Sequence, residues 1–436
     1  MSVKVLAGLA CGVITVGALS AFPSRVQAQQ QAAPAAAAAA DADDPVRVMV
    51  GRLELDKYKA TIKGLTHFGD RRQGTDRNRA AVDWIEAQLK SYGCTNTERI
   101  KYDYQPAPAA GRGGAGGRGE AAGAAGQGAG RGAPAGAAGQ RGGGRGRAGQ
   151  GGSTIFGTRA PTGVNNDANA QTDVKLRELN SQPSTPGARE EVYCTKVGTT
   201  RPDEMYIVAG HMDGHGFNEA ANDDGSGTAL VMELARIFSS PDVQTERSIR
   251  FALWNNEETG LNGARAYVDQ RKDLQGKENP PGSGRYPEPK WLGMFQHDMM
   301  MFDHGMPGPD GKVSPEQRRE ADVNIEFQST AQMADAAQKL AWFVKAANEK
   351  YATDYPAAVG PHMTNTDSTP FMDLVPAISL RENERGSQIG GGWDPHWHQV
   401  TDVFSTFSDN DFRLGLNAAQ TTLGAVAQLT GATLKK

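Results

Sequence analysis

The chain has 436 residues, a formal net charge of -4 and a hydrophobic fraction of 38%. This length allows two or three domains or one large α/β domain, and the nearly balanced charge argues against a general affinity for nucleic acid. Glycine is the unusual component, with 54 residues, and most of the excess falls into one internal segment.

The first residues of the chain predict export. Met1–Ala28 has Lys4 near its start, an apolar run that ends at about Phe22, and small residues at its end, a pattern typical of a secretory signal peptide. An uncleaved membrane anchor is the alternative, but the run is short for a membrane span and contains Gly and Ser. We therefore expect a periplasmic or secreted protein without stable membrane association after cleavage. Residues 29–45 are Ala-rich and predict a loose linker.

Residues 46–436 are predicted to form one domain with an insertion. Apolar residues recur at helical spacing in two pieces of Pro45–Gly93, most clearly in Asn78–Tyr92, and Thr97–Tyr104 predicts a strand. Residues 105–153 consist almost wholly of Gly, Ala, Gln and Arg, so they cannot bury a core and predict a disordered insertion. RNA binding by this tract is the alternative, but it does not suit an exported protein.

Two cysteines remain after the predicted signal peptide. Cys94 precedes the strand Thr97–Tyr104, and Cys194 lies in Glu190–Val197, which predicts a second strand paired with the first. In an oxidising compartment, one disulfide between Cys94 and Cys194 is expected, and two free thiols are the alternative.

The strongest signal begins at a short buried strand, Met205–Gly210. His211 and Asp213 follow it, and residues two apart in an extended segment point to the same side. Asp223 then lies in a Gly-rich turn that leads into an apolar helical pattern, where glycines let the backbone approach a bound ion. This combination is typical of metal ligands. The alternative is that Asp223 or Asp224 only caps the helix and that His211 belongs to the core.

Further acidic and histidine residues follow later segments. They are Glu257 and Glu258 after the predicted strand Arg250–Trp254, Asp298 after Trp291–Phe295, and His398 before a final helix capped by Ser408. Alternating strands and helices predict an α/β fold with a mixed, mostly parallel central sheet and helices on both faces. The candidates at the strand ends lie where open α/β sheets place their sites.

The five motifs together resemble metallopeptidase family twenty-eight, the co-catalytic zinc aminopeptidases related to glutamate carboxypeptidase II. The motifs are His-x-Asp at His211, the Asn-Asp-Asp-x-Ser-Gly turn at Asn222, Glu-Glu-x-Gly-Leu at Glu257, the strand-end Asp298 and the late His398. The resemblance covers about Val46–Tyr104 and Glu190 to the C-terminus. One departure is Ser368, which stands where the family usually has His after Ser-Asp.

The resemblance implies a site with two divalent ions. Asp223 would bridge the ions, His211 and Asp298 would complete one position, and Glu258 and His398 would complete the other. Nitrogen and oxygen ligands without thiolate favour two zinc ions, with cobalt or manganese as substitutes. His396 is the rival of His398, which is preferred because it stands four residues before Asp402.

Two further residues receive roles from the same resemblance. Asp213 would hold the ring of His211, and Glu257 would act as general base. The implied function is exopeptidase action on peptide substrates, as an aminopeptidase. A carboxypeptidase or a glutaminyl cyclase of the same fold is the alternative, and an inactive, receptor-like binding protein is the alternative from another class. Side-chain preference and oligomeric state are not predicted.

Overall fold

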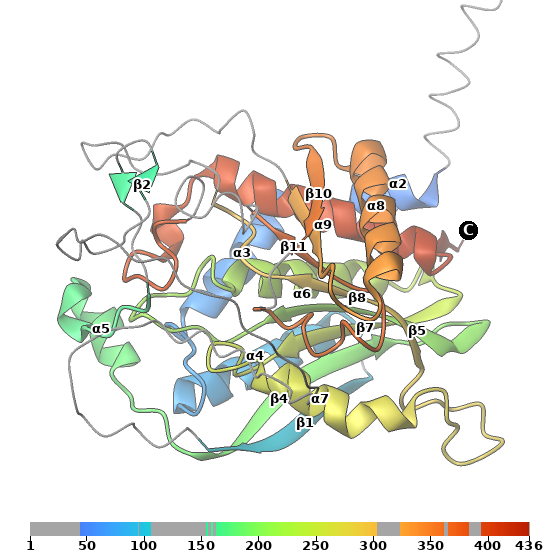
Figure 1. Ribbon diagram of the computed structural model, residues 1–436, viewed down its shortest axis with the longest axis horizontal. Helices are drawn as coiled ribbons and strands as arrows, with labels where there is room; N and C mark the ends of the chain where they lie inside the picture. Colours follow the sequence, from blue (N-terminus) through green and yellow to red (C-terminus); the bar gives the residue numbers. More distant parts are fainter. Residues whose placement is uncertain are drawn as a thin grey trace, which may run out of the picture. The chain divides into compact units, whose positions relative to one another are not determined.

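Eight strands form the central sheet of the computed structural model, in the order β1-β4-β7-β5-β8-β11-β9-β10 (Figure 1). Their bounds are β1 Thr97–Tyr104, β4 Gly187–Lys196, β5 Arg201–His211, β7 Arg247–Trp254, β8 Lys290–His297, β9 Val323–Phe327, β10 Ala357–Pro361 and β11 Ala377–Arg381. The central strands β7, β5, β8 and β11 are parallel, whereas β4 and β9 join them antiparallel. The prediction of a mixed, mostly parallel sheet is confirmed.

The structure describes residues 44–94, 96–105, 154–155, 158–159, 163–302, 323–361, 365–382 and 394–435. The predicted signal peptide 1–28, nearly all of the linker 29–45 and nearly all of the insertion 105–153 lie outside these ranges. The residues from Pro45 onward belong to one compact unit. Within the described ranges, no helix is both long and apolar enough to cross a membrane.

Helices cover both faces of the sheet, as predicted. Their bounds are α2 Pro45–Val50, α3 Leu55–Thr66, α4 Asp76–Ser91, α5 Val174–Asn180, α6 Gly225–Phe238, α7 Asn262–Arg271, α8 Ala334–Tyr351 and α9 Asp409–Leu429. Side chains alternate along β5, so that Val208 joins one apolar core with α3, α6, α8 and α9. Ile207 and Ala209 join a second core with α7 on the opposite face.

The disulfide between Cys94 and Cys194 is present, which confirms that prediction. Cys94 follows α4, and Cys194 lies in β4, which pairs antiparallel with β1 as expected. The covalent bond therefore fastens the α4 layer to the outer part of the sheet.

Two predictions about the elements were wrong in detail. The helical pattern before residue 67 forms two helices, α2 and α3, which are separated by a short turn at Gly51. Pro45, the first residue of the segment Pro45–Gly93 that was predicted to be helical, begins α2, because proline fits the first turn of a helix. Strands β9 and β10 were not predicted, and β10 contains Gly360 and Pro361, which do not favour a strand.

Candidate active site

The site lies at the carboxyl ends of the parallel strands. His211 is the last residue of β5 and stands in register with Trp254, the last residue of β7, while Gly210 stands opposite His297 at the end of β8. The segments that follow these three strands therefore start at one edge of the sheet. Open α/β sheets place their ligands at this edge.

The turn before α6 brings a further acidic residue to this edge. Gly210 and Gly227 allow the approach, since a Cβ on Gly210 would lie 2.9 Å from the Gly227 carbonyl carbon, and one on Gly227 would lie 2.7 Å from the His297 carbonyl oxygen. Side chains larger than glycine would force α6 away from β5. The start of α6 is thus held directly over the strand ends.

Asp223 and Asp224 divide two functions between them. Asp224 caps α6, because its Oδ1 accepts the N–H groups of Gly227 at 2.9 Å and Met299 at 3.1 Å, and its Oδ2 accepts the His211 N–H at 3.0 Å. Its side chain therefore ties α6, β5 and the segment after β8 together. Asp223 is left to face the histidines.

The two oxygens of Asp223 face different imidazoles. Oδ1 lies 3.4 Å from His211 Nε2, and Oδ2 lies 3.0 Å from His398 Nε2. The main chain of this residue is fixed by Asp402, whose Oδ2 accepts the Asp223 N–H at 3.1 Å and whose Oδ1 accepts the Asn222 N–H at 2.8 Å. A carboxylate placed in this way is suited to bridge two cations.

Potential metal-binding side chains collect in two groups around Asp223. The first group contains His211, Glu257 and Asp298, and the second contains His215, Glu258 and His398. Within each group the ligand atoms lie within 4.8 Å of one another. The structure thus brings all seven residues of the predicted site together, and it adds His215, which had no predicted role.

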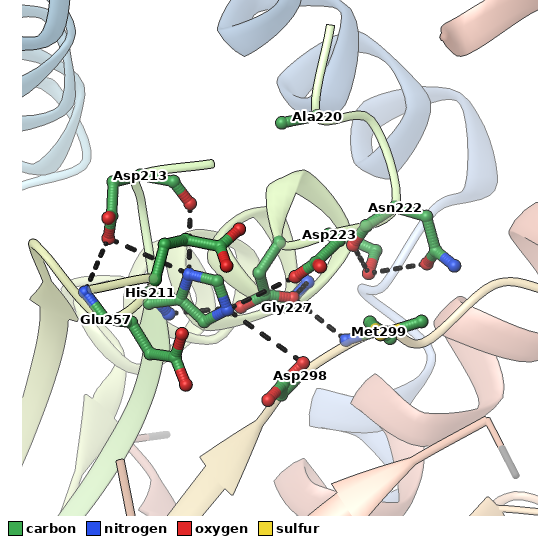
Figure 2. A network of polar contacts seen from close by, with 12 residues as sticks. His211, Asp213, Ala220, Asn222, Asp223, Gly227, Glu257, Asp298 and Met299 are labelled. Carbon is green, nitrogen blue, oxygen red and sulfur yellow. Dashed lines mark hydrogen bonds and ion pairs between the residues drawn. The ribbon is translucent and has the colours of Figure 1, made fainter. Parts of the chain in front are cut away.

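In the first group, His211 lies between several acidic residues. Figure 2 shows its ring with Asp213 on one side and with Asp223 and Asp298 on the other. Its Nε2 lies 3.9 Å from Asp298 Oδ1, and its Nδ1 lies 3.0 Å from the carbonyl oxygen of Asp213. The ring is therefore oriented by the main chain of Asp213, whereas the carboxylate, expected to do this, stands 3.8 Å away and accepts the Glu257 N–H at 3.0 Å.

In the second group, Glu258 contacts two imidazoles. Its Oε2 lies 2.9 Å from His398 Nε2 and 3.0 Å from His215 Nε2. Trp397 stacks on the His398 ring with 4.1 Å between the ring centroids. His398 has a φ of 58°, in the left-handed region that non-glycine residues adopt rarely and mostly where surrounding contacts impose it.

The electrostatics of the site follow from burial beside opposite charges. Burial disfavours charge on Glu258, yet the imidazoles of His215 and His398 lower its pKa well below the usual value. Burial likewise opposes the charged form of His398, but Glu258 and Asp223 raise its pKa to about 10. Glu257 differs, because burial raises its pKa well above the usual value.

Two residues next to the groups were not singled out from the sequence. Arg381, at the end of β11, is fully buried and holds Asp298 through an ion pair of 2.7 Å. Asp367 is fully buried, and neither of its oxygens has a hydrogen-bond partner in the described structure. Burial raises the pKa of Asp367 well above its usual value. Asp367 directly precedes Ser368, which stands where the family usually has His, and this departure is the signal in the sequence that points to the segment.

Comparisons with known proteins agree with this geometry. The sequence pattern of peptidase family M28 matches residues 192–419, more than half of the chain. This chain belongs to peptidase family M28. The match includes every residue of the two groups, from His211 to His398.

Curated relatives of this M28 chain are similar over short segments. Aminopeptidase YwaD of Bacillus subtilis is 40% identical over 78 residues, 18% of this chain, and carboxypeptidase Q of Xenopus laevis is 33% identical over 76 residues, 17% of this chain. The aligned residues span 16% of the length of each of these relatives.

Solved structures share the fold of this M28 chain. BSAP, a zinc aminopeptidase from Bacillus subtilis, superposes with a TM-score of 0.54 at 13% identity, covering 86% of this chain and 95% of that chain. LapA of Legionella gives 0.53 at 14% identity, covering 88% and 75%. At such identities the likeness establishes the fold alone.

Proposed function

We propose that this protein is an exported di-zinc exopeptidase that removes residues from the N-terminus of peptide substrates. The observation that carries the proposal is the position of Asp223, whose two oxygens face the imidazoles of His211 and His398. Membership of peptidase family M28 supports peptide hydrolysis. Two of the curated relatives carry the name aminopeptidase, which supports action at the N-terminus, while others are named carboxypeptidase Q, the stated alternative.

The donor atoms of the two groups fit divalent cations. Glu258 Oε1, in the second group, and Asp213 Oδ2, in the residue whose carbonyl oxygen contacts the His211 ring, are buried atoms without a hydrogen-bond partner in the described structure. Buried carboxylates in such number are costly unless cations balance them. Imidazole and carboxylate ligands without thiolate suit zinc, with cobalt or manganese as substitutes. His211, Asp223 and Asp298 would hold one ion, and Asp223, Glu258 and His398 would hold the other.

Bound zinc would make water more acidic and would polarise the scissile carbonyl group. The chain would supply the proton carrier. Glu257 is half-buried and lies beside His211, and its pKa is raised above the usual value of a carboxyl group, so its carboxylate is suited to take a proton from the attacking water and give it to the departing amine. Asp213 fixes the main chain of Glu257 through its Oδ1, which keeps this carboxylate beside His211. Asp298 is fixed in turn by Arg381.

The charge around the site favours a cationic end of the substrate. Asp367 presents two buried oxygens without hydrogen-bond partners, close enough to His211 and Asp298 to affect their charges. The buried Arg381 is already engaged by Asp298 and lies 3.4 Å from Glu326. Bound ions would balance the carboxylates that hold them, so the preference would come from Asp367, whose two buried oxygens are able to accept hydrogen bonds from a free α-ammonium group.

Hydrolysis of matched peptide substrates tests the proposal. We expect cleavage of amino-acid anilides and of peptides with a blocked C-terminus, and no cleavage when the N-terminus is acetylated. Chelation should abolish activity, and added zinc or cobalt should restore it. Equal rates on acetylated peptides would contradict N-terminal action, and a requirement for a free C-terminus would establish a carboxypeptidase.

The same assay separates the remaining alternatives. A glutaminyl cyclase would release ammonia from peptides with N-terminal glutamine without breaking a peptide bond. An inactive binding protein would retain its metal ions but turn over none of these substrates.

Export is a further part of the proposal. The pattern of residues 1–28 predicts a signal peptide. A disulfide such as Cys94–Cys194 persists in oxidising compartments and is rare in the cytosol. N-terminal sequencing of protein recovered from the periplasm or medium should show that residues 1–28 have been removed.

A further inference from the structure

His215 has no role in the predicted set of ligands, yet it lies against the second group. It follows His211 by four residues, and its Nε2 is 3.0 Å from Glu258 Oε2. Its ring meets the His398 ring edge to face, with 4.1 Å between the centroids. The donor atoms of His215, Glu258 and His398 all lie within 4.8 Å of one another. They are close enough to share one cation.

The main chain holds His215 and His398 together. Asn218 Nδ2 donates to the carbonyl oxygens of His215 and Gln399, both at 2.9 Å, and so links the two segments that carry the imidazoles. Gly216 has a φ of 113°, and a Cβ there would lie 2.7 Å from the carbonyl oxygen of His398. Only glycine allows this approach without strain. The position of the His215 ring is thus built into the fold.

The contact between His215 and Glu258 brings an imidazole nitrogen to within 3.0 Å of a carboxylate oxygen. His215 Nε2 is buried and has no hydrogen-bond partner in the described structure, although the carboxylate oxygen is at a suitable distance. Glu258 Oε1 is buried and also without a partner. An imidazole nitrogen and a carboxylate oxygen at this distance are both able to donate lone pairs to one cation.

We infer that His215 is a ligand of the second metal position, together with His398, Glu258 and one oxygen of Asp223. The inference rests on the proposed function in assuming that divalent ions bind to the site. Zinc accepts imidazole nitrogen and carboxylate oxygen donors, and its coordination number can expand to five, which leaves a place for water beside these four donors. The first position has one imidazole, from His211, and the second has two. Because the second position has four protein ligands and the first has three, the second should hold its ion more tightly than the first.

Metal titration of variants tests this assignment. Metal-free wild-type protein, His215→Ala, His215→Asn and His67→Ala are titrated with zinc in competition with a chromophoric chelator, and with Co²⁺ monitored by its visible absorption. His67 is exposed at the end of α3 and serves as the matched control. Loss of an outer hydrogen-bonding partner costs about 10–100-fold in metal affinity, so loss of a ligand should cost at least about 100-fold.

We expect wild type and His67→Ala to bind two ions with unequal affinity. His215→Ala should lose the tighter binding step, change the Co²⁺ spectrum and recover affinity when free imidazole is added. His215→Asn, which keeps an N–H donor but no imidazole, should behave like His215→Ala. Melting of the metal-free proteins verifies that they are folded.

Two results would overturn the inference. One is unchanged affinity in His215→Ala, and the other is full recovery in His215→Asn, which would make His215 a hydrogen-bond donor. X-ray absorption of the zinc-loaded wild type gives an answer that needs no variant, because three coordinated imidazoles are expected instead of two. If the wild-type protein binds no divalent ion, the proposed function itself is contradicted. If wild type and His215→Ala bind two ions with the same affinities, only the role of His215 is contradicted.

Discussion

Glu257 and Glu258 are neighbours in the chain, but their carboxylates belong to different groups of ligands. Glu257 lies with His211 and Asp298, whereas Glu258 lies with His215 and His398. Nearby imidazoles lower the pKa of Glu258, while burial raises the pKa of Glu257. In the proposed function, Glu258 would be the ligand and Glu257 the proton carrier.

Substitution of each glutamate by glutamine should produce different failures. Glu257→Gln keeps the size of the side chain but cannot accept a proton, so the protein should retain two ions while activity falls by about 10²–10⁴. Glu258→Gln removes a charged ligand, so stoichiometry after dialysis should fall toward one ion, and excess zinc should recover some activity. Metal analysis together with rates measured with and without added zinc distinguishes them. Loss of an ion from Glu257→Gln would instead make Glu257 a ligand.

The disulfide should contribute to stability without contributing to catalysis. Cys94 and Cys194 are 100 residues apart, and closing a loop of this length stabilises a protein by about 4.7 kcal/mol in the chain-entropy model, with about 2–4 kcal/mol typical of measurements. In urea unfolding, the Cys94→Ala/Cys194→Ala variant should have a free energy of unfolding about 2–4 kcal/mol lower than wild type, while its metal content stays the same. Reduced wild-type protein should match the variant. A matching loss of metal would show that the disulfide shapes the site.

The centre of the fold could be predicted from the sequence, but its periphery could not. The strand before His211 and the helix after Asp223 have apolar patterns that decide their structure locally. β9 and β10 are short, and their pairing depends on contacts with β11 and with one another, which no local pattern encodes. The break between α2 and α3 is likewise not encoded by a local pattern.

The site shows the same division between local and distant information. Asp223, Glu258 and His398 could be identified because their motifs are distinctive. His215 and Arg381 could not, because their roles depend on segments far away in the chain, Glu258 for the first and Asp298 for the second. The spacing of four residues between His211 and His215 is not enough to place His215, because the sequence does not show that the segment after β5 returns toward His398.

The titration of His297 should make stability fall at mildly acidic pH. Burial lowers the pKa of this histidine to about 4, against about 6.5 in the unfolded chain. The Nδ1 atom of its ring lies 3.0 Å from the Ala209 carbonyl oxygen, and the Nε2 atom lies 2.8 Å from Thr422 Oγ1. Because the pKa of His297 is lower in the folded than in the unfolded chain, the neutral ring contributes fully to the stability of the fold above about pH 6.5. This contribution is lost as the pH falls toward about 4.

The size of this effect follows from the interval between the two pKa values. One pKa unit corresponds to about 1.36 kcal/mol, so the free energy of unfolding should fall by about 2 kcal/mol between pH 6.5 and pH 5. Urea unfolding of metal-free protein at pH 7 and pH 5 measures it, with His297→Asn as the comparison, because this variant retains a neutral donor and does not titrate. An equal loss in both proteins would show that His297 takes no part and that the carboxylates account for the pH dependence.

Asp402 should control both metal positions at once, although it belongs to neither group. Its two oxygens accept the main-chain N–H groups of Asn222 and Asp223, so it fixes the residue that is proposed to bridge the ions. In Asp402→Asn, one oxygen is replaced by an amide N–H₂ group, which faces a main-chain N–H. Loss of a supporting hydrogen bond of this kind costs about 10–100-fold in metal affinity. Both binding steps should therefore weaken together, in contrast to Glu258→Gln, where one step is lost.

The titration that measures this effect needs a matched acidic control. Asp409 is exposed at the start of α9 and pairs with Lys59, so Asp409→Asn removes the same charge far from any proposed ligand and should bind both ions like wild type. Weakening of a single step in Asp402→Asn would mean that the two positions do not share Asp223. That result would contradict the bridging arrangement itself, because a shared ligand cannot be displaced for one ion and kept in place for the other.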